Sequence, residues 1–130
     1  MPFAETVVSG IQPSGTLHLG NYFGALRQHV RLAAEAREAY YFIVNYHALT
    51  TLKDREALER YTFDVALDYL ALGFDPDKAH LFLQSDVPQV TELAWVFLCL
   101  TPVSQLEKGL AYKDKVAQGL SANGGLFTYP

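Results

Sequence analysis

The alternation of apolar and polar stretches along the chain predicts strands that alternate with helices. Short apolar runs at 6–9, 40–46 and 79–83 are rich in branched and aromatic residues, and we expect each to be a buried strand. Between them, residues 18–36 and 54–72 have the apolar spacing and the length of helices. Strands joined by helices of this length favour a parallel sheet with right-handed connections. The pattern therefore predicts a β-α-β-α-β unit.

The second expected helix has a start signal and a stop signal. Asp54 is suited to an N-cap, Gly73 to a left-handed C-cap, and Pro76 prevents the helix from continuing. Its apolar positions recur every three or four residues and are 58, 61, 65, 69 and 72. Its polar positions form a stripe at 56, 60, 64 and 68. This spacing predicts one buried face and one solvated face.

The pattern becomes less regular after the third expected strand. Residues 84–86 are interpreted as a loop, and Pro88 suits the first position of a helix that ends near Leu100. Trp95 and its large apolar neighbours in that helix are typical of a core or of a contact with another subunit. Residues 104–120 can be helical but are polar, and 121–125 are expected to be a flexible joint.

The segment between the first strand and the first helix has the composition of a nucleotide site. Residues 10–21 read Gly-Ile-Gln-Pro-Ser-Gly-Thr-Leu-His-Leu-Gly-Asn. A strand that ends at a glycine, a tight turn, and the unpaired N–H groups of a first helical turn together attract phosphate. We expect the imidazole N–H of His18 to face a phosphate, and the missing Cβ of Gly20 to let an adenine or ribose approach the backbone. The glycines do not have the spacing of a dinucleotide site, so ATP is the better match.

Further polar residues follow the other expected strands. In parallel sheets, ligands bind beyond the carboxyl ends of the strands, so we expect Gly10, His47 and Gln84 to lie along one edge. A simpler interpretation of His47 is equally open, because histidines at strand ends often only cap a loop with a hydrogen bond.

His-Leu-Gly-Asn at 18–21 resembles the His-Ile-Gly-His signature of class I aminoacyl-tRNA synthetases. The whole 10–21 segment is similar to the tryptophanyl branch of that family. Other blocks that are similar in kind and order to tryptophanyl-tRNA synthetases occupy 24–28, 42–49, 69–76, 82–88 and 126–130. The resemblance implies a Rossmann-like α/β fold, in which residues 1–130 form a single domain, the amino-terminal part of the nucleotide-binding fold. It also implies that about 88–125 belong to a helical insertion.

The resemblance implies an enzyme, a tryptophan–tRNA ligase. This activity converts tryptophan and ATP, accompanied by Mg²⁺, to tryptophanyl-adenylate and transfers tryptophan to tRNA(Trp). It further implies a homodimer. The family has a longer chain, with a second signature near Lys-Met-Ser-Lys-Ser that this sequence does not contain, so the 130 residues are expected to be an incomplete, ATP-binding part.

The resemblance also assigns roles to individual residues. His18 would stabilise the charge that builds on the α-phosphate as the tryptophan carboxylate attacks it. Lys115 matches a mobile lysine that reaches the triphosphate, although it, Lys108 and Lys113 are equally explained as a solvated face. The implied ATP-binding residues are Gln12, Pro13, Ser14, His18, Gly20 and Asn21. The implied tryptophan-binding residues are Val8, which is otherwise core, His47 and Tyr129.

One departure and two alternatives remain open. Asn45 stands where the family usually has Asp, which removes a charge at that position. Tyrosyl-tRNA synthetases share the fold and a His-x-Gly-x signature, so tyrosine is the alternative amino acid. A fragment that binds adenine nucleotide without catalysis, or that serves folding and dimerisation, is the non-enzymatic alternative.

The composition of the chain limits the kinds of partner and the cellular location that we expect for the protein. With 130 residues of which 50% are hydrophobic, the chain suits one compact domain with its own core. A formal net charge of −4 argues against binding nucleic acid by charge alone. Cys99 is the single cysteine, which excludes an intrachain disulfide and a cysteine-based zinc site, and no protein metal site is expected. The longest apolar run, 94–100, is far below the ~20 residues that cross a bilayer, so we expect a cytoplasmic protein without a membrane partner.

Overall fold

The computed structural model of the chain describes residues 6–109, 113–114, 117, 119 and 123–128. In this part of the chain, β1 (Thr6–Ile11), β2 (Glu38–Ile43) and β3 (His80–Leu83) form one parallel sheet in the order β1-β2-β3. The helical segments before β3 are α1 (Leu19–Asn21), η1 (Tyr22–Leu26), α2 (Arg27–Glu35), α3 (Asn45–Ala48) and α4 (Arg55–Ala71). After β3 come η2 (Gln84–Asp86), α5 (Gln89–Leu100), α6 (Val103–Leu106) and α8 (Gly124–Thr128). The predicted β-α-β-α-β unit with a parallel, Rossmann-like sheet is confirmed.

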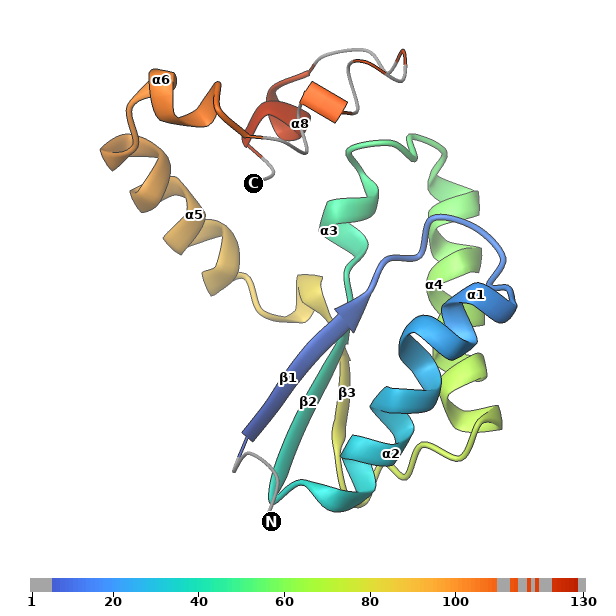
Figure 1. Cartoon of the computed structure of the whole chain (residues 1–130). Coiled ribbons are helices and arrows are strands. Elements are labelled where there is room, and N and C mark those ends of the chain that lie inside the picture. Colours follow the sequence, from blue (N-terminus) through green and yellow to red (C-terminus); the bar gives the residue numbers. More distant parts are fainter. Residues whose placement is uncertain (1–5, 110–112, 115–116, 118, 120–122, 129–130) are drawn as a thin grey trace.

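The helices cover the sheet unequally. Figure 1 shows α2 and α4 on the same side of the sheet, and α2 contacts β1 and β2 while α4 contacts β2. Helix α5 leads away from β3 in the other direction, and α6 and α8 follow it (Figure 1). The chain therefore has a sheet backed on one face by two helices, with a second group of helices beyond the carboxyl ends of the strands.

The two faces of the sheet differ in burial because successive side chains of a strand point to opposite sides. In β2, Ala39, Tyr41 and Ile43 are buried, whereas Tyr40 and Phe42 are only partly buried. The buried face packs against Leu26, Val65 and Tyr69 in the hydrophobic core, together with residues from β1 and the loop after α4. The other face carries ring pairs between neighbouring strands: Tyr40 stacks on His80, and Phe42 stacks on Phe82.

Helix α4 forms where its local signals predict. The Asp54 carboxylate accepts a hydrogen bond from the Ala57 N–H at 2.7 Å, and Gly73 has a φ of 92°, the left-handed conformation that favours glycine. Val65 and Tyr69 are fully buried as expected. Leu72 is 38% exposed, so the prediction of a buried Leu72 is wrong; it is the C-cap, where the chain already leaves the helix.

Strands β1 and β2 differ in length and position from the prediction. β1 continues through Gly10 to Ile11, where Gly10 pairs with Phe42. A Cβ on Gly10 would lie 2.7 Å from the Phe42 carbonyl oxygen and 2.8 Å from Cγ2 of Val44, so a side chain does not fit there. β2 runs from Glu38 to Ile43 rather than over 40–46, because the chain turns into α3 at Asn45.

The predicted 18–36 helix contains an unpredicted π-helical turn. The Arg27 N–H donates to the Tyr22 carbonyl, five residues back, and η1 separates α1 from α2. Leu26 in this turn is buried, whereas Phe23 is 63% exposed. Residues before this turn therefore face a different direction, relative to residues after it, from the one they would face in an uninterrupted α-helix.

Beyond β3, four expectations are corrected. Residues 84–86 form a 3₁₀ turn rather than an open loop, and Gly124 and Gly125, expected in a flexible joint, begin helix α8. Pro88 directly precedes α5 rather than occupying its first position. No residue of α5 is buried in the described structure, and Trp95 is 69% exposed, so the interpretation of this helix as core is wrong. Of the stretch 104–120, the structure places residues 104–106 in α6.

Candidate functional site

The connection from β1 to the first helix is a compact turn. The Ser14 N–H donates to the Gln12 carbonyl at 3.0 Å, and the Pro13 ring is fully buried, whereas the Ser14 side chain is exposed. Pro13 thus anchors the turn to the core and leaves Ser14 at the surface. Leu17, which precedes the helix, packs against the core.

His18 caps the first helix in a defined orientation. Its Nδ1 accepts a hydrogen bond from the Gly20 N–H at 3.1 Å, and its own N–H donates to the Asn21 Oδ1 at 3.0 Å. A neutral imidazole whose Nδ1 accepts carries its proton on Nε2, so this ring is held as an Nε2–H donor. A Cβ on Gly20 would lie 2.8 Å from the Cε1 atom of His18, so the glycine makes room for the imidazole itself.

A second group of polar side chains joins the carboxyl ends of all three strands. The Gln12 Nε2 donates to the His47 carbonyl at 3.4 Å, and the His47 Nδ1 lies 3.0 Å from the Gln84 Oε1. Gln84 is only 5% exposed, so its amide depends on such partners. Gly10 lies next to the carboxyl end of β1, and His47 and Gln84 follow the carboxyl ends of β2 and β3, so the expectation that the three lie along one edge is confirmed.

Asn45 and Ser85 form a reciprocal pair beside this group. The Asn45 Nδ2 donates to the Ser85 Oγ at 2.8 Å, and the Ser85 N–H donates to the Asn45 Oδ1 at 3.1 Å. The two bonds connect the first residue of α3 with the middle residue of η2. In the sequence, Asn45 stands out only as a departure from a family pattern, and no local signal indicates Ser85.

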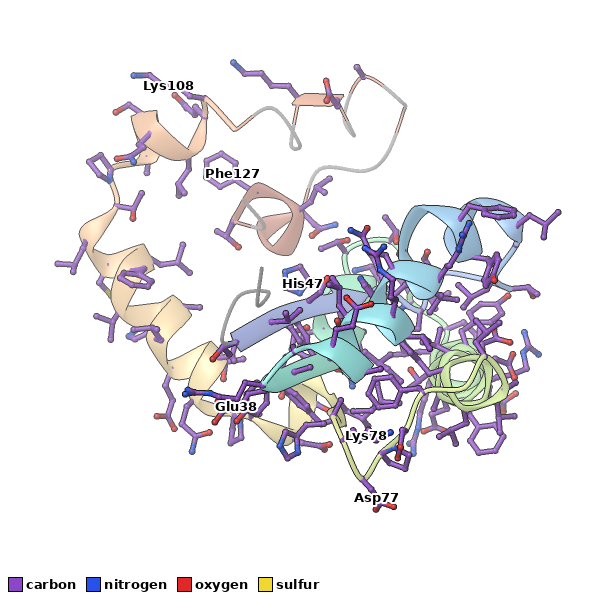
Figure 2. The ribbon with its side chains drawn as sticks, turned by 60° about the horizontal axis from the view of Figure 1, so that its bottom comes forward. Glu38, His47, Asp77, Lys78, Lys108 and Phe127 are labelled. Carbon is purple, nitrogen blue, oxygen red and sulfur yellow. The ribbon has the colours of Figure 1, made fainter. Side chains whose placement is uncertain are left out.

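The His47 edge opens into a cleft of about 480 Å³. Its walls include His47, Gln84, Thr91 of α5 and Thr128 of α8. In Figure 2, His47 lies between the sheet and the helix that contains Phe127, and far from Glu38 at the other end of β2. A cleft of this size, with both polar and apolar residues in its walls, suits a small organic ligand.

Other predicted site residues lie elsewhere or outside the described structure. Val8 is 63% exposed on the sheet face that α2 and α4 leave open, so its interpretation as core is wrong. Lys115 and Tyr129 lie outside the described residues. Lys108 and Lys113 are exposed.

A buried polar network adjoins the glycine turn. His29 of α2 places its Nε2 3.0 Å from the Ser9 Oγ and its Nδ1 2.7 Å from the Tyr69 hydroxyl. Burial lowers the pKa of His29 and raises the pKa of Tyr69 and of Tyr41, whose ring centroid is 4.8 Å from that of His29. Among the described residues, none forms a hydrogen bond with the buried Tyr41 Oη. Nothing in the sequence spacing links these residues, so the network was not predicted.

Three further observations concern the described residues. None of their helices is long and apolar enough to cross a membrane. No group of three or more His, Cys, Asp or Glu side chains among them converges in a way that could hold a metal ion. Cys99 is an exposed thiol.

Known proteins with similar sequences are tryptophan–tRNA ligases. The chain is 54% identical over 123 residues to the tryptophan–tRNA ligase of Fusobacterium nucleatum and 55% identical over 124 residues to that of Rhodopirellula baltica. Both alignments cover 95% of this chain and 38% of the relative. The chain therefore spans somewhat more than a third of the length of these curated relatives.

Solved structures of tryptophanyl-tRNA synthetases are also similar to this chain. Tryptophanyl-tRNA synthetase from Campylobacter jejuni, complexed with ADP and tryptophan, matches with a TM-score of 0.89 and 49% identity, over 96% of this chain and 39% of that one. The enzyme from Mycoplasma pneumoniae matches with a TM-score of 0.85 and 32% identity, over 98% of this chain and 37% of that one. The family described as tRNA synthetases class I (W and Y) matches residues 4–130. The geometry at the strand ends, the relatives and the family match agree, and the chain belongs to the class I tRNA synthetases of the tryptophan and tyrosine group.

Proposed function

We propose that this chain is the ATP-binding and tryptophan-binding part of a tryptophan–tRNA ligase. In the reaction, a carboxylate oxygen of tryptophan attacks the α-phosphorus of ATP, the bond from that phosphorus to the bridging oxygen of the β-phosphate breaks, and pyrophosphate leaves. The tryptophanyl group is then transferred from the adenylate to tRNA(Trp). The relatives with this name and the similar structure that contains ADP and tryptophan support the assignment.

The observation that carries the proposal is the orientation of His18. Because its Nδ1 is occupied by the Gly20 N–H, its Nε2–H is the group left to donate outward at the start of a helix. A donor fixed in advance stabilises negative charge that develops on the α-phosphate more effectively than a mobile donor does. In this proposal His18 acts as a hydrogen-bond donor and does not remove a proton.

The remaining nucleotide contacts follow from the same turn. Gln12, Ser14 and Asn21 supply polar side chains along it, and the buried Pro13 holds its backbone in place. We expect Mg²⁺ to enter with ATP, because Mg²⁺ is commonly bound through substrate phosphates with few protein ligands. Lys115 is proposed to reach the triphosphate.

The amino acid is proposed to occupy the cleft beside His47. The mixture of apolar walls and a polar edge suits an indole ring with an amino-acid head group. Val8 and Tyr129 are proposed to contribute further contacts with tryptophan. Residues from about 88 to 125 are proposed to form the helical insertion that closes this side.

The proposal is tested by replacing His18 in the complete protein and measuring tryptophan-dependent exchange of pyrophosphate into ATP. His18→Ala is expected to lower the exchange rate by ~10²-fold, as the loss of one charge-stabilising donor does in other enzymes. His80→Ala is the matched control, since His80 is an exposed histidine that stacks on Tyr40. An exchange rate that His18→Ala leaves unchanged removes His18 from the mechanism.

The same assay distinguishes the amino acids. Exchange that depends on tyrosine and ignores tryptophan would replace the proposal with a tyrosyl-tRNA synthetase, the other member of the matched group. Calorimetry with ATP and with tryptophan on the 130-residue chain addresses the remaining alternative. Binding of nucleotide without turnover is the result expected if the chain alone is an incomplete, non-catalytic part.

We also propose that the protein is a homodimer in which α5 contributes to the contact. Leu93, Trp95, Phe97 and Leu100 are each more than half exposed in the single chain, and exposed apolar surfaces of this kind are typical of interfaces. Sedimentation equilibrium of Trp95→Glu against the unchanged protein tests this, since a charge at a paired apolar surface is expected to shift the mass toward the monomer.

A further inference from the structure

We propose that Asn45 and Ser85 are positioning residues, which hold His47 and Gln84 in the orientation that the amino-acid cleft requires. The inference rests on the proposed function for the role of the cleft. The orientation itself is a property of the chain and is measured independently of any activity.

The pair continues the sheet past the point where the strands end. Ile43 and Leu83 are the last residues paired between β2 and β3, and Asn45 and Ser85 are each two residues further along. Beyond Ile43 the backbone leaves the ladder for α3, so side chains take over the connection. Together they tie two short turns that have little buried apolar surface of their own.

These two turns carry His47 and Gln84, two of the polar residues that line the cleft. His47 is two residues after Asn45 in α3, and Gln84 directly precedes Ser85 in η2. The His47 Nδ1 lies 3.0 Å from the Gln84 Oε1, so the two turns meet through this bond as well. If the Asn45 pair is lost, α3 and η2 lose two of the hydrogen bonds that join them, and the His47–Gln84 bond, on which the ligand site depends, carries more of the connection.

The consequence for His47 is a defined protonation pattern. Gln84 Oε1 is an acceptor, so a neutral His47 that bonds to it carries its proton on Nδ1, and its Nε2 is an acceptor. This is the opposite arrangement to His18, whose Nδ1 accepts. The Asn45 and Ser85 pair preserves the distance at which this arrangement of His47 is favoured.

The chemistry of the pair predicts which substitutions are tolerated. In Asn45→Asp, one carboxylate oxygen still accepts the Ser85 N–H, and the Ser85 hydroxyl reverses its role and donates to the other oxygen. In Asn45→Ala both bonds are lost. In Asn45→Asp combined with Ser85→Ala, the second oxygen loses its hydroxyl donor, so the rescue by Asp depends on Ser85.

The first experiment observes the imidazole nitrogens of His47 by ¹⁵N NMR in the full chain. The unchanged chain and Asn45→Asp are expected to show neutral His47 protonated on Nδ1, whereas Asn45→Ala shows a mixture of the two tautomers. Asp54→Ala is the matched control, because it also removes a side-chain bond to a backbone N–H at the start of a helix, but at α4. It is expected to leave the His47 signals unchanged.

The second experiment measures tryptophan affinity by calorimetry in the complete protein. Asn45→Ala is expected to weaken binding by about tenfold, a loss consistent with a displaced hydrogen-bonding group. Adding Asn45→Ala to His47→Ala is expected to cause no further loss, because a positioning residue acts through the group it positions.

The outcomes separate this inference from the proposed function. His47 signals that are the same in Asn45→Ala as in the unchanged chain overturn the positioning role, whatever the affinity. So does Asn45→Asp behaving like Asn45→Ala, or a full additional loss in the double variant. If instead the spectra change as expected and His47→Ala leaves tryptophan affinity unaltered, the control of His47 orientation stands and the proposed amino-acid site is wrong.

Discussion

His29 of α2 and Tyr69 of α4 are forty residues apart in the chain and meet in the core, where the His29 Nδ1 lies 2.7 Å from the Tyr69 hydroxyl. The opposite nitrogen of the ring lies 3.0 Å from the Ser9 Oγ, one residue before Gly10. His29 is only 8% exposed, and each of its two ring nitrogens has a hydrogen-bonding partner. The imidazole thus connects α2 with β1 and α4 at the base of the candidate nucleotide turn.

The pKa of His29 predicts how stability responds to acid. Burial lowers this pKa below the ordinary 6.5, so the unfolded chain takes up the proton at a higher pH than the folded chain does. The contribution of neutral His29 to the free energy of unfolding is therefore fully present above pH 6.5. It is lost as the pH falls from 6.5 through the lowered pKa of His29. The groups that face the ring from the other elements are Ser9, Tyr41 and Tyr69, none of which is negatively charged to oppose this shift.

Urea unfolding at a series of pH values between 5 and 8 measures this dependence, with His29→Gln as the comparison. The glutamine does not titrate and can still bond to Ser9 or Tyr69, so its stability should vary less between pH 5 and 6.5. Parallel curves for the two proteins would show that other groups cause the acid sensitivity.

Two tyrosines in the same core are expected to respond oppositely to loss of the hydroxyl. Tyr69→Phe leaves the His29 Nδ1 buried without its partner, which is expected to destabilise the fold by about 1–3 kcal/mol. Tyr41→Phe removes a buried hydroxyl that has no partner, and is expected to stabilise the fold by about 1 kcal/mol. Denaturant titrations of both variants measure the difference, and equal losses in the two would contradict it.

Gly10 and Gly24 form a second contrasting pair. In Gly10→Ala the new methyl group meets the Phe42 carbonyl and the Val44 side chain, so we expect a loss of about 1–3 kcal/mol from overpacking between β1 and β2. In Gly24→Ala nothing lies within 4 Å of the new methyl group in the helical turn, so we expect a gain of about 0.5–1 kcal/mol. Thermal or urea unfolding of the two variants is the measurement, and a neutral Gly10→Ala would contradict the close approach.

Gly20→Ala tests the orientation of His18 without removing the imidazole. The added methyl group would lie under 3 Å from the His18 ring, so the ring must leave the position in which Nδ1 accepts the Gly20 N–H. We expect pyrophosphate exchange by the complete protein to fall by about tenfold or more, since a misdirected donor loses much of its effect. Gly24→Ala again serves as control, and an undiminished exchange rate in Gly20→Ala would show that this orientation is not required.

Elements with local signals were predicted well from the sequence. Helix α4 begins and ends beside Asp54 and Gly73, whose side chain and backbone act within one helical turn. The parallel sheet follows from the order of strands and helices along the chain. In each case the residues that decide the structure are neighbours in the chain.

Features that depend on distant residues were missed or misplaced. The apolar run continues past Ile43, but the strand ends there and the chain enters α3, where Asn45 bonds to Ser85, forty residues away. The same separation hid the partner of His29, and no periodicity in α2 distinguishes a histidine that bridges two elements from one that merely packs. The burial of helix α5 was mispredicted for another reason: its composition is that of a core, whereas in the single chain none of its residues is buried.

The π-helical turn at Tyr22–Leu26 sets the direction in which His18 faces relative to His29. A π-helical turn contains about one residue more than an α-helical turn, so the two histidines face as they would in a regular helix that is one residue shorter. Deleting one residue at 22–26 is therefore expected to give a regular helix with His18 in its present direction. An inserted residue that forms no second wide turn is expected to rotate His18 about the helix axis by about 100°, while His29 stays in the core.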